Sequence, residues 1–346
     1  MAGSFSGSRG APGSAGVTLL RLAFAILLLG LAAGTFAFPS LLRAKIESAG
    51  SAVCPDCRLE LGGLAWSISP FGVRLSGVRF RSGDTRDSAV FVEARRVLVP
   101  LRPSSLGGGP LRLGRIRAEG LAVTVWEGDA HFPSSARSGE GAGFEAEGFE
   151  ATGASFTYRK DSPAGTAYLR IGEVEASGGR FGTSAAYVGQ PLRAHAGAVL
   201  EKSGKIDLTV SARYFVAPAW ADVDLRVDGQ RLAGVNGYFE PEEGVTLRGR
   251  LLKSRALVKV RATRAEGWVF ARFDGLGLKF HRNRHRGGFA ALLDNLAVRV
   301  KLKGENLDDP PVEAQKAVVS RRHARESAVS FVLRTLREAA VRVAGK

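Results

Sequence analysis

Short runs of alternating apolar and polar residues cover most of this chain, and this pattern limits its fold more than any other feature. The clearest stretch extends from Pro100 to Asp129, where a turn rich in Gly, Pro and Ser precedes two alternating runs. The alternation slips at Gly114, and a turn or bulge is expected near Gly120. Because successive side chains of a strand point to opposite faces of a sheet, this alternation predicts β-structure with one apolar face.

The pattern around Gly120 recurs further along the chain when Gly153 and Gly178 are superimposed on it. The positions that then align are Ile116, Phe149 and Val174; Ala118, Ala151 and Ala176; and Val123, Phe156 and Phe181. The spacings of 33 and 25 residues are unequal, so a recurring strand unit is predicted and not a strict solenoid repeat. Chance coincidence of Ala and Gly, in a chain with 44 glycines, is the alternative explanation.

Regular alternation from Lys205 to Lys303 predicts further strands with one apolar and one cationic face. The apolar positions of these strands are Leu208, Val210, Val223, Leu225, Val245, Leu247, Val258, Val260, Leu276, Leu278, Leu296, Val298, Val300 and Leu302. Residues 245–307 contain 15 Lys and Arg against four acidic residues, so most of the net charge of +16 falls there. Such an excess favours a polyanionic partner, although a GC-rich genome would also produce an excess of arginine.

The first 38 residues divide into a flexible tail and an expected membrane anchor. Residues 1–16 are rich in Gly, Ser and Ala, which predicts a tail with nothing to pack. Residues 17–38 carry Arg21 as their only charge, and a helix of this length can cross a hydrocarbon core of roughly 30 Å. An uncleaved transmembrane helix is favoured over a signal peptide, for which residues 35–37 are a weak cleavage-like site.

Cys54 and Cys57 are the only cysteines of the chain. One pair without His at zinc-finger spacing cannot supply four metal ligands, and no strand–helix pattern of the thioredoxin type surrounds it. A small structural disulfide formed outside the cytosol is favoured over free thiols. This weakly favours an amino terminus inside the cytosol and the rest of the chain outside it.

The sequence carries no pattern of an established type of active site. It has no nucleophile elbow, phosphate-binding Gly loop or paired-His helix, and its five His residues lack ligand spacing, so no enzyme, cofactor or metal is expected. A basic run from His281 to Gly288 contains Arg282, Arg284 and Arg286. Because no aromatic residues alternate with these arginines, phosphate headgroups are the expected ligands and nucleic acid is not.

The last residues, 308–346, are expected to form a basic amphipathic helix. The segment begins with two Asp and two Pro residues, and about thirty residues without Gly or Pro follow. An apolar stripe near period 3.6 includes Ala317, Val318 and Leu333, with arginines on the opposite side. Such a helix would lie on an anionic membrane surface or cover an end of the sheet.

Units such as VRLSGVRF and EARRVLVPLRPSSLGGGPLRLGRIRAEGLAVTV, after a single-pass anchor, resemble the AsmA-like family of bacterial envelope proteins. The matching positions are Val73, Leu75, Gly77, Val78, Phe80, Val97, Val99, Pro100, Leu101, Leu106, Leu111, Ile116, Gly120 and Val123. The resemblance covers about residues 17–125 and implies a curved antiparallel β-groove, a taco-like sheet that here comprises residues 39–307. It also implies that this periplasmic domain is held to the inner membrane and carries phospholipid towards the outer membrane.

The expectation is therefore an inner-membrane protein whose apolar groove shelters phospholipid acyl chains, with Arg282, Arg284 and Arg286 at the headgroups. It would assist lipid transport or outer-membrane biogenesis, with other envelope proteins as partners and an oligomeric state that the sequence does not predict. Large family members are several times longer, and about 14 strands give a groove of only roughly 65 Å. The second hypothesis is an envelope scaffold whose sheet packs on itself and whose basic face binds an anionic partner. A third, a redox or metal-dependent enzyme, depends on Cys54 and Cys57 alone.

Overall fold

The computed structural model describes residues 57–82, 90–102, 110–127, 144–162, 164–182, 184–213, 220–261, 264–281, 315–319 and 335. The chain divides into two compact units, Met1–Ile46 and Glu47–Lys346, and all described residues belong to the second unit. Within them, no helix combines the length and the hydropathy that crossing a bilayer requires. The predicted tail and anchor, residues 1–16 and 17–38, lie outside the described residues.

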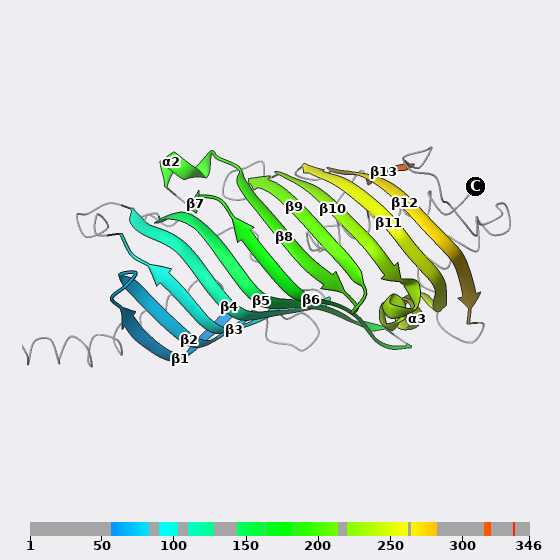
Figure 1. Cartoon of the computed structure of the whole chain (residues 1–346), viewed down its shortest axis with the longest axis horizontal. Helices are drawn as coiled ribbons and strands as arrows, with labels where there is room; N and C mark the ends of the chain where they lie inside the picture. The colour runs from blue at the N-terminus through cyan, green and yellow to red at the C-terminus, as the bar shows by residue number, and fades with distance from the viewer. Residues whose placement is uncertain are drawn as a thin grey trace, which may run out of the picture. The chain divides into compact units, whose positions relative to one another are not determined.

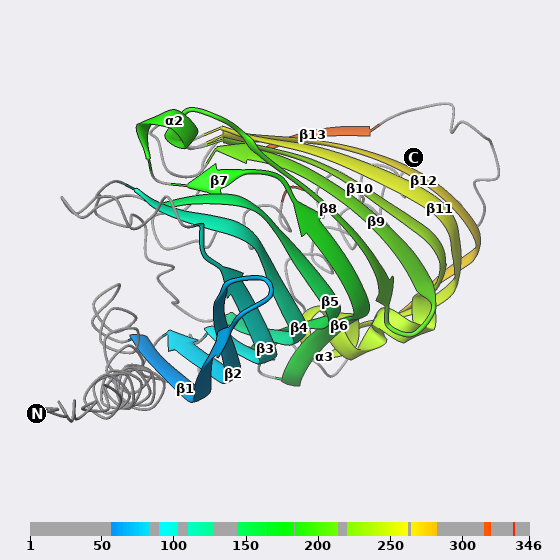
Figure 2. The same cartoon turned by 60° about the vertical axis from the view of Figure 1, so that its left-hand side comes forward.

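One curved, unclosed β-sheet dominates the described unit, which confirms the prediction of a mostly β protein with a curved sheet (Figures 1 and 2). Its strands are β1 (Cys57–Ser67), β2 (Gly72–Ser82), β3 (Val90–Pro100), β4 (Leu111–Glu127), β5 (Phe144–Ser162), β6 (Gly165–Gly178), β7 (Phe181–Gly182), β8 (Leu192–Leu200), β9 (Gly204–Arg213), β10 (Trp220–Arg231), β11 (Val245–Arg261), β12 (Arg264–Phe280) and β13 (Gln315–Val319). The helical elements are α2 (Ala185–Val188), η3 (Leu232–Val235) and α3 (Asn236–Glu243).

Neighbouring strands follow the order of the chain, and β7 alone lies off this path, paired with β5. All pairs of the main path are antiparallel except β4 and β5, which are parallel, so the prediction of a wholly antiparallel sheet is wrong at this one position. Antiparallel neighbours can be joined by a tight turn, whereas parallel neighbours need a crossover of a dozen or more residues. Residues 128–143, between β4 and β5, are long enough for that crossover.

The parallel pair reproduces the sequence repeat residue by residue. Its register pairs Ile116 with Phe149, Ala118 with Ala151, and Val123 with Phe156, which are the positions that align when Gly120 and Gly153 are superimposed. The third unit does not follow this rule, because β6 turns back on β5 after Ser162 and must run antiparallel. Ala176 still pairs with Ala151, but Val174 pairs with Ala154 and the remaining alignment around Gly178 is not reproduced.

Glycines with a positive φ keep the apolar side chains of the long strands on one face. The irregularity at Gly120 is a positive-φ residue inside a single strand, β4, and not a turn between two strands; the register of β4 with β3 and β5 is the same before and after it. Gly77, Gly120 and Gly153 have positive φ angles of 56°, 60° and 57°, which cost a residue without a Cβ little. In β4 the apolar positions shift from even numbers (Ala118) to odd numbers (Val123) across Gly120. The positive φ of Gly120 turns the backbone at this point, so the side chains that follow return to the apolar face and one such face continues along the strand.

The segment η3–α3 covers the apolar face where β8, β9 and β10 have ended but β6 and β11 continue. Val235 of η3 and Val245 and Leu247 of β11 form a buried cluster, and Leu169, Leu200, Leu232, Phe239 and Leu278 pack against it. The Asn236 side chain accepts a hydrogen bond from the Leu247 amide (2.8 Å) and donates one to the Leu247 carbonyl (3.0 Å). The Glu201 carboxylate, in the turn after β8, accepts a hydrogen bond from the Arg170 amide of β6 (2.6 Å). Side chains thus satisfy strand groups that the shorter neighbours leave unpaired.

The end of the chain differs from the predicted helix over residues 308–346. Gln315–Val319, which include Ala317 and Val318 of the expected helical stripe, form strand β13 and pair with β12. Pairing an otherwise open sheet edge satisfies backbone groups in register, which outweighs local helical periodicity. Thr335 is helical and fully buried, and a Cβ placed on Gly267 of β12 would lie 2.8 Å from its Cγ2 atom. Thr335 therefore covers part of the apolar face of β12.

Replacing Gly153 by Ala should separate backbone strain from packing, because an added Cβ at this position meets no atom within 4 Å. We expect Gly153→Ala to lower the free energy of unfolding by about 1–2 kcal/mol, since φ is positive there. Gly197→Ala is the matched control, because that site is equally open and has no positive φ. It should change stability by no more than about 0.5 kcal/mol in urea unfolding. Equal losses in the two variants would contradict this account of the positive φ at Gly153.

Candidate functional site

A continuous apolar row crosses the sheet from β1 to β12. Each member is the direct cross-strand partner of the next, and the row consists of Leu64, Leu75, Val97, Ala118, Ala151, Ala176, Ala196, Leu208, Leu225, Ala256 and Val269. The row includes Leu208 and Leu225, two of the positions that the sequence predicts for the apolar face. Alternation along each strand thus becomes one uninterrupted apolar surface across eleven strands.

The middle of this row is made of alanines, which the sequence analysis did not single out as a site. Ala118, Ala151, Ala176 and Ala196 pair in succession from β4 to β8. Rows of larger side chains lie on both sides, including Ile116 paired with Phe149 and Val123 paired with Phe156. A methyl side chain rises less from a sheet than a branched or aromatic one, so the alanines form the lowest part of the face. The sequence signal that could have revealed this row was the alignment of Ala118, Ala151 and Ala176 in the recurring strand unit.

The chain itself covers only part of the apolar face. Val245, Leu247 and Val258 are buried, with exposures of 0%, 7% and 1%, because η3–α3 and Thr335 lie over this end of the sheet. They belong to the core, so their sequence-based assignment to a lipid-binding surface is not supported by their position. Val260 packs against buried Ala265, and Leu278 packs against the cluster under η3–α3.

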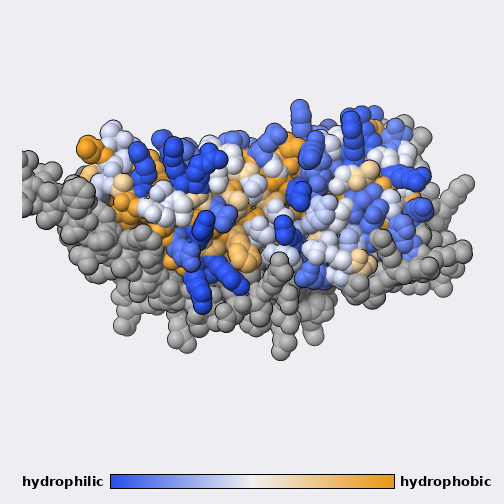
Figure 3. All heavy atoms as spheres, turned by 90° about the horizontal axis from the view of Figure 1, so that it is seen from below, coloured by the Kyte–Doolittle hydropathy of each residue, from blue (hydrophilic) through white to orange (hydrophobic). Residues whose placement is uncertain are grey.

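Several apolar side chains of the apolar face are only half-buried, although Ala212 of β9 and Val227 of β10 are buried. Leu208, Val210, Val223, Leu225 and Leu276 are half-buried. No residue of β8 is buried, although β8 lies between β6 and β9 in the sheet. Figure 3 shows apolar side chains gathered in a band bordered by polar side chains on the side viewed there. Within the described residues, no second sheet packs on the apolar face, so these side chains remain partly accessible.

Several predicted site residues cannot be located. Leu296, Val298, Val300 and Leu302, and the arginines Arg282, Arg284 and Arg286, lie outside the described residues. Cys54 also lies outside them, and Cys57 is described only as the first residue of β1. Their predicted roles at acyl chains, at headgroups and in a disulfide therefore stay predictions.

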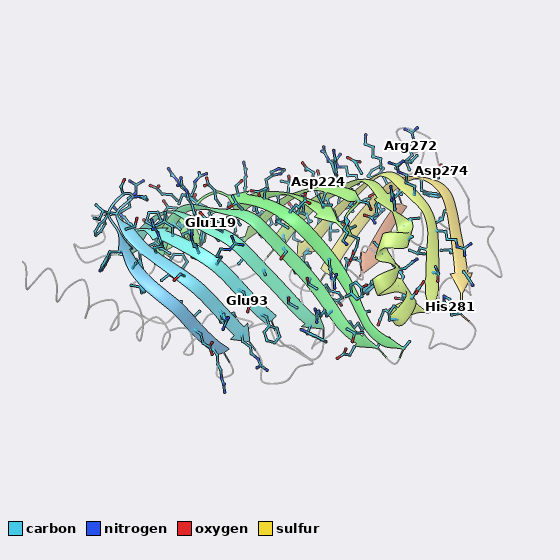
Figure 4. All side chains as sticks on the ribbon, turned by 60° about the horizontal axis from the view of Figure 1, so that its bottom comes forward. Glu93, Glu119, Asp224, Arg272, Asp274 and His281 are labelled. Carbon is cyan, nitrogen blue, oxygen red and sulfur yellow. The ribbon has the colours of Figure 1, made fainter. Side chains whose placement is uncertain are left out.

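The opposite face of the sheet carries cross-strand ion pairs. Glu119 and Asp224 are among the side chains that project from the upper side of the sheet in Figure 4. Ion pairs between neighbouring strands join Arg79 to Glu93, Arg96 to Glu119, Arg112 to Glu145, Arg115 and Arg117 to Glu150, Asp222 to Arg261, and Asp224 to Arg255. Many of these pairs join residues directly opposite in register, so they favour the observed strand alignment over a slipped one.

Asp224 is the best-connected acid of this polar face. The Arg255 guanidinium holds its carboxylate with two hydrogen bonds, of 2.9 Å from Nε and 2.6 Å from Nη2, and Arg226 lies 3.8 Å away. The hydrogen bonds from Arg255 lower the pKa of Asp224 more than partial burial raises it, and the charges of both arginines lower it further. Arg226 and Arg255 face each other directly in the register, so Asp224 offsets a repulsion between two cations.

The described residues contain no group of three His, Cys, Asp or Glu side chains placed to hold a metal ion. The best-connected histidine is His281, labelled in Figure 4, whose Nε2 lies 2.7 Å from the Thr246 hydroxyl oxygen. That hydroxyl lies 2.7 Å from Glu240 and donates its proton to the carboxylate. The imidazole therefore donates to Thr246, and the hydroxyl is not set up as a nucleophile. These two hydrogen bonds connect Glu240 of α3 with Thr246 of β11 and with His281, directly after β12.

Comparison with known proteins found no family model that matches the chain and no curated protein similar to it. A proposed function therefore rests on the fold and on the apolar face of the sheet.

A charge on the apolar face should distinguish its covered end from its accessible middle. Val245→Asp should lower the free energy of unfolding by at least about 3 kcal/mol, because it buries an unpaired charge under Val235. Leu208→Asp should cost only about 1–2 kcal/mol, since that side chain is half-buried. Thr209→Asp, on the opposite face of β9, is the control. Urea unfolding measures all three, and equal losses at Leu208 and Val245 would show that the middle is also core.

Stability should fall in acid partly through Asp224. Its pKa in the folded state lies below its usual value of 3.8, so its contribution is present above that value and is lost as the pH falls through the lowered pKa. Asp224→Asn should therefore lose less stability than wild type between pH 7 and pH 3, with a difference of at most about 1 kcal/mol. Asp228→Asn, exposed on the same strand, is the control, and urea unfolding at both pH values is the measurement. An unchanged acid response in Asp224→Asn would contradict the assignment.

Proposed function

We propose that this chain is an AsmA-like envelope protein that shelters phospholipid acyl chains on its apolar face and assists lipid transport or outer-membrane biogenesis. In this proposal residues 17–38 anchor it in the inner membrane and the sheet lies in the periplasm. The apolar face of the sheet serves as a groove for acyl chains, and no cofactor or catalytic step is involved.

One observation carries the proposal. The apolar face continues across eleven strands, yet large side chains such as Leu208 and Leu225 in its middle are only half-buried, with no second sheet over them in the described part of the chain. A soluble protein normally buries such a face, because exposed apolar surface costs about 25 cal/mol per Å². A lipid tail that covers the face recovers about 0.8 kcal/mol for each CH₂ group that it buries.

The alanine row gives that tail a path. A side chain of one carbon leaves depth above the sheet, and the larger rows that include Phe149 and Phe156 form its sides. Ala256 and Val269 are buried at the covered end, so the part of the row that is open to lipid runs from Leu64 to Leu225 and, at about 4.8 Å between neighbouring strands, extends roughly 38 Å. An acyl chain that fills half of a bilayer core needs only about 15 Å. The face is thus long enough for lipid to shift along it without leaving apolar contact.

The same length supports a role shared with other envelope proteins. Roughly 38 Å of apolar row holds about two acyl chains end to end. In the proposal the chain receives lipid at the inner membrane and passes it to a partner, and does not bridge the two membranes alone. Phospholipid headgroups would meet basic side chains at the edges of the sheet, among them the predicted contacts Arg282, Arg284 and Arg286.

A scaffold for an anionic partner is the second candidate, and one observation favours it. On the polar face, Arg226 and Arg255 are direct cross-strand neighbours with Asp224 as their shared counter-ion. Two adjacent cations offset by one carboxylate leave a positive surface, which is suited to an acidic protein or to lipopolysaccharide. In this alternative the partner binds the polar face, and the apolar face contributes only to folding.

Photocrosslinking in cells tests the first proposal on the full chain. A p-benzoylphenylalanine at Leu208 should form covalent adducts with phospholipid, found by mass spectrometry of the purified protein, because this side chain belongs to the accessible apolar face. The same group at Thr209, the next residue of β9 on the opposite face, should form none. Lipid adducts at neither site, in a protein shown to be folded, would reject the proposal, and protein adducts at Thr209 alone would favour the scaffold.

A further inference from the structure

Exposed large apolar side chains gather at one end of the first four strands. Ile68 and Phe71 in the turn between β1 and β2, and Leu111 at the start of β4, are 92%, 48% and 43% exposed. Among the described residues only one other large apolar side chain, that of Tyr168, is counted as exposed. Single exposed apolar residues are ordinary, but three that share one end of a sheet form a feature that needs a cause.

Backbone contacts hold these residues next to each other. The Leu101 amide, just after β3, donates a hydrogen bond to the Phe71 carbonyl (2.9 Å), and Leu101 forms a β-bridge with Leu113 of β4. The Arg102 amide donates to the Arg112 carbonyl (2.9 Å), directly after Leu111. The β1–β2 turn, the end of β3 and the start of β4 are therefore one continuous edge, and we call Trp66, Ile68, Phe71 and Leu111 the apolar rim.

Aromatic stacking gives the rim a fixed shape. The rings of Trp66 and Phe71 stack across the turn with their centroids 6.1 Å apart and an angle of 14° between their planes. Ile68 lies between them in sequence and projects from the turn almost without contact, as its 92% exposure shows. A side chain that projects from a tight turn is not surrounded by a pocket into which a side chain of a protein partner could pack. It suits a medium that closes around any shape, as lipid does.

The chemistry of the rim matches the boundary layer of a bilayer. Tryptophan and other aromatic residues favour that layer, and basic side chains favour its phosphates. Arg74 is exposed on β2 opposite Ala65, and Arg102 and Arg112 lie at the same end, paired with Glu147 and Glu145. The chain has a net charge of +16, which attracts it to anionic lipid.

The length of the chain before β1 permits this contact. Residues 39–56 separate the predicted anchor from β1, and 18 residues span at most about 60 Å. Strand β1 has 11 residues, or about 36 Å from its first residue to the rim. An anchored chain can therefore place the rim on the membrane that holds its anchor.

We propose that the apolar rim inserts into the surface of a lipid bilayer and docks this end of the sheet on the membrane. This goes beyond the proposed function, because the rim can bind a bilayer whether or not lipid occupies the apolar face. In this proposal one end of the sheet lies at the membrane. It is the end where β1 and β3 finish and where β2 and β4 begin.

Fluorescence from a probe on the rim tests the proposal with the full chain in vesicles of phosphatidylethanolamine and phosphatidylglycerol. A nitrobenzoxadiazole group is attached to Ile68→Cys in a background of Cys54→Ser and Cys57→Ser. Inserted, it should emit at shorter wavelength, be quenched by lipids with a nitroxide on the acyl chain, and be protected from aqueous iodide. The control is Lys202→Cys in the exposed turn between β8 and β9, which should show the reverse. Phe71→Cys repeats the measurement if the first variant does not fold.

Equal access of iodide to the two positions would overturn the proposal. Protection from iodide without quenching by the nitroxide lipids would also overturn it, because the rim would then be covered by protein. The outcome is separate from the photocrosslinking experiment. Lipid quenching at the rim together with no adducts at Leu208 would support docking and reject the binding of acyl chains on the apolar face. Adducts at Leu208 without quenching at the rim would support acyl-chain binding and reject docking.

Discussion

Hydrogen bonding between neighbouring backbones is the interaction on which this sheet depends, because a single layer cannot rely on a second sheet for its core. The pairing continues from β1 to β13 without closing. Where β8 to β10 end early, the side chains of Glu201 and Asn236 occupy the unpaired groups of β6 and β11. An open strand edge inside the sheet would cost free energy at each unsatisfied group and would invite other strands to pair there.

The same constraint explains the two faces. A strand of 17 or 19 residues, such as β4 or β5, can hold one apolar face only if its alternation is reset where the sheet bends. Gly120 and Gly153 provide this reset in adjacent strands. On the other face, ion pairs such as that of Arg96 with Glu119 lie at matched positions of the register. A slip by one residue would place charges among the apolar rows, so packing and electrostatics specify the same alignment.

Period-two alternation was sufficient to predict a mostly β chain with one apolar face. It was insufficient where neighbours and not local pattern decide the outcome. Gln315–Val319 fit a helical stripe, yet they pair with the edge of β12. Val245 and Val258 have the same pattern as Leu208, but η3–α3 and Thr335 bury the first two. Nothing in the sequence of the β1–β2 turn indicates that Ile68 and Phe71 share an edge with Leu111.

The sequence by itself determined that the chain forms strands with one apolar and one polar face, because side-chain direction alternates with every residue and needs no partner. It also determined where the strands bend, since a positive φ favours glycine. Only the tertiary structure decided which strands run parallel, which apolar residues are covered and which remain accessible. Those properties depend on what lies beside or above a strand, and a segment distant in sequence supplies it.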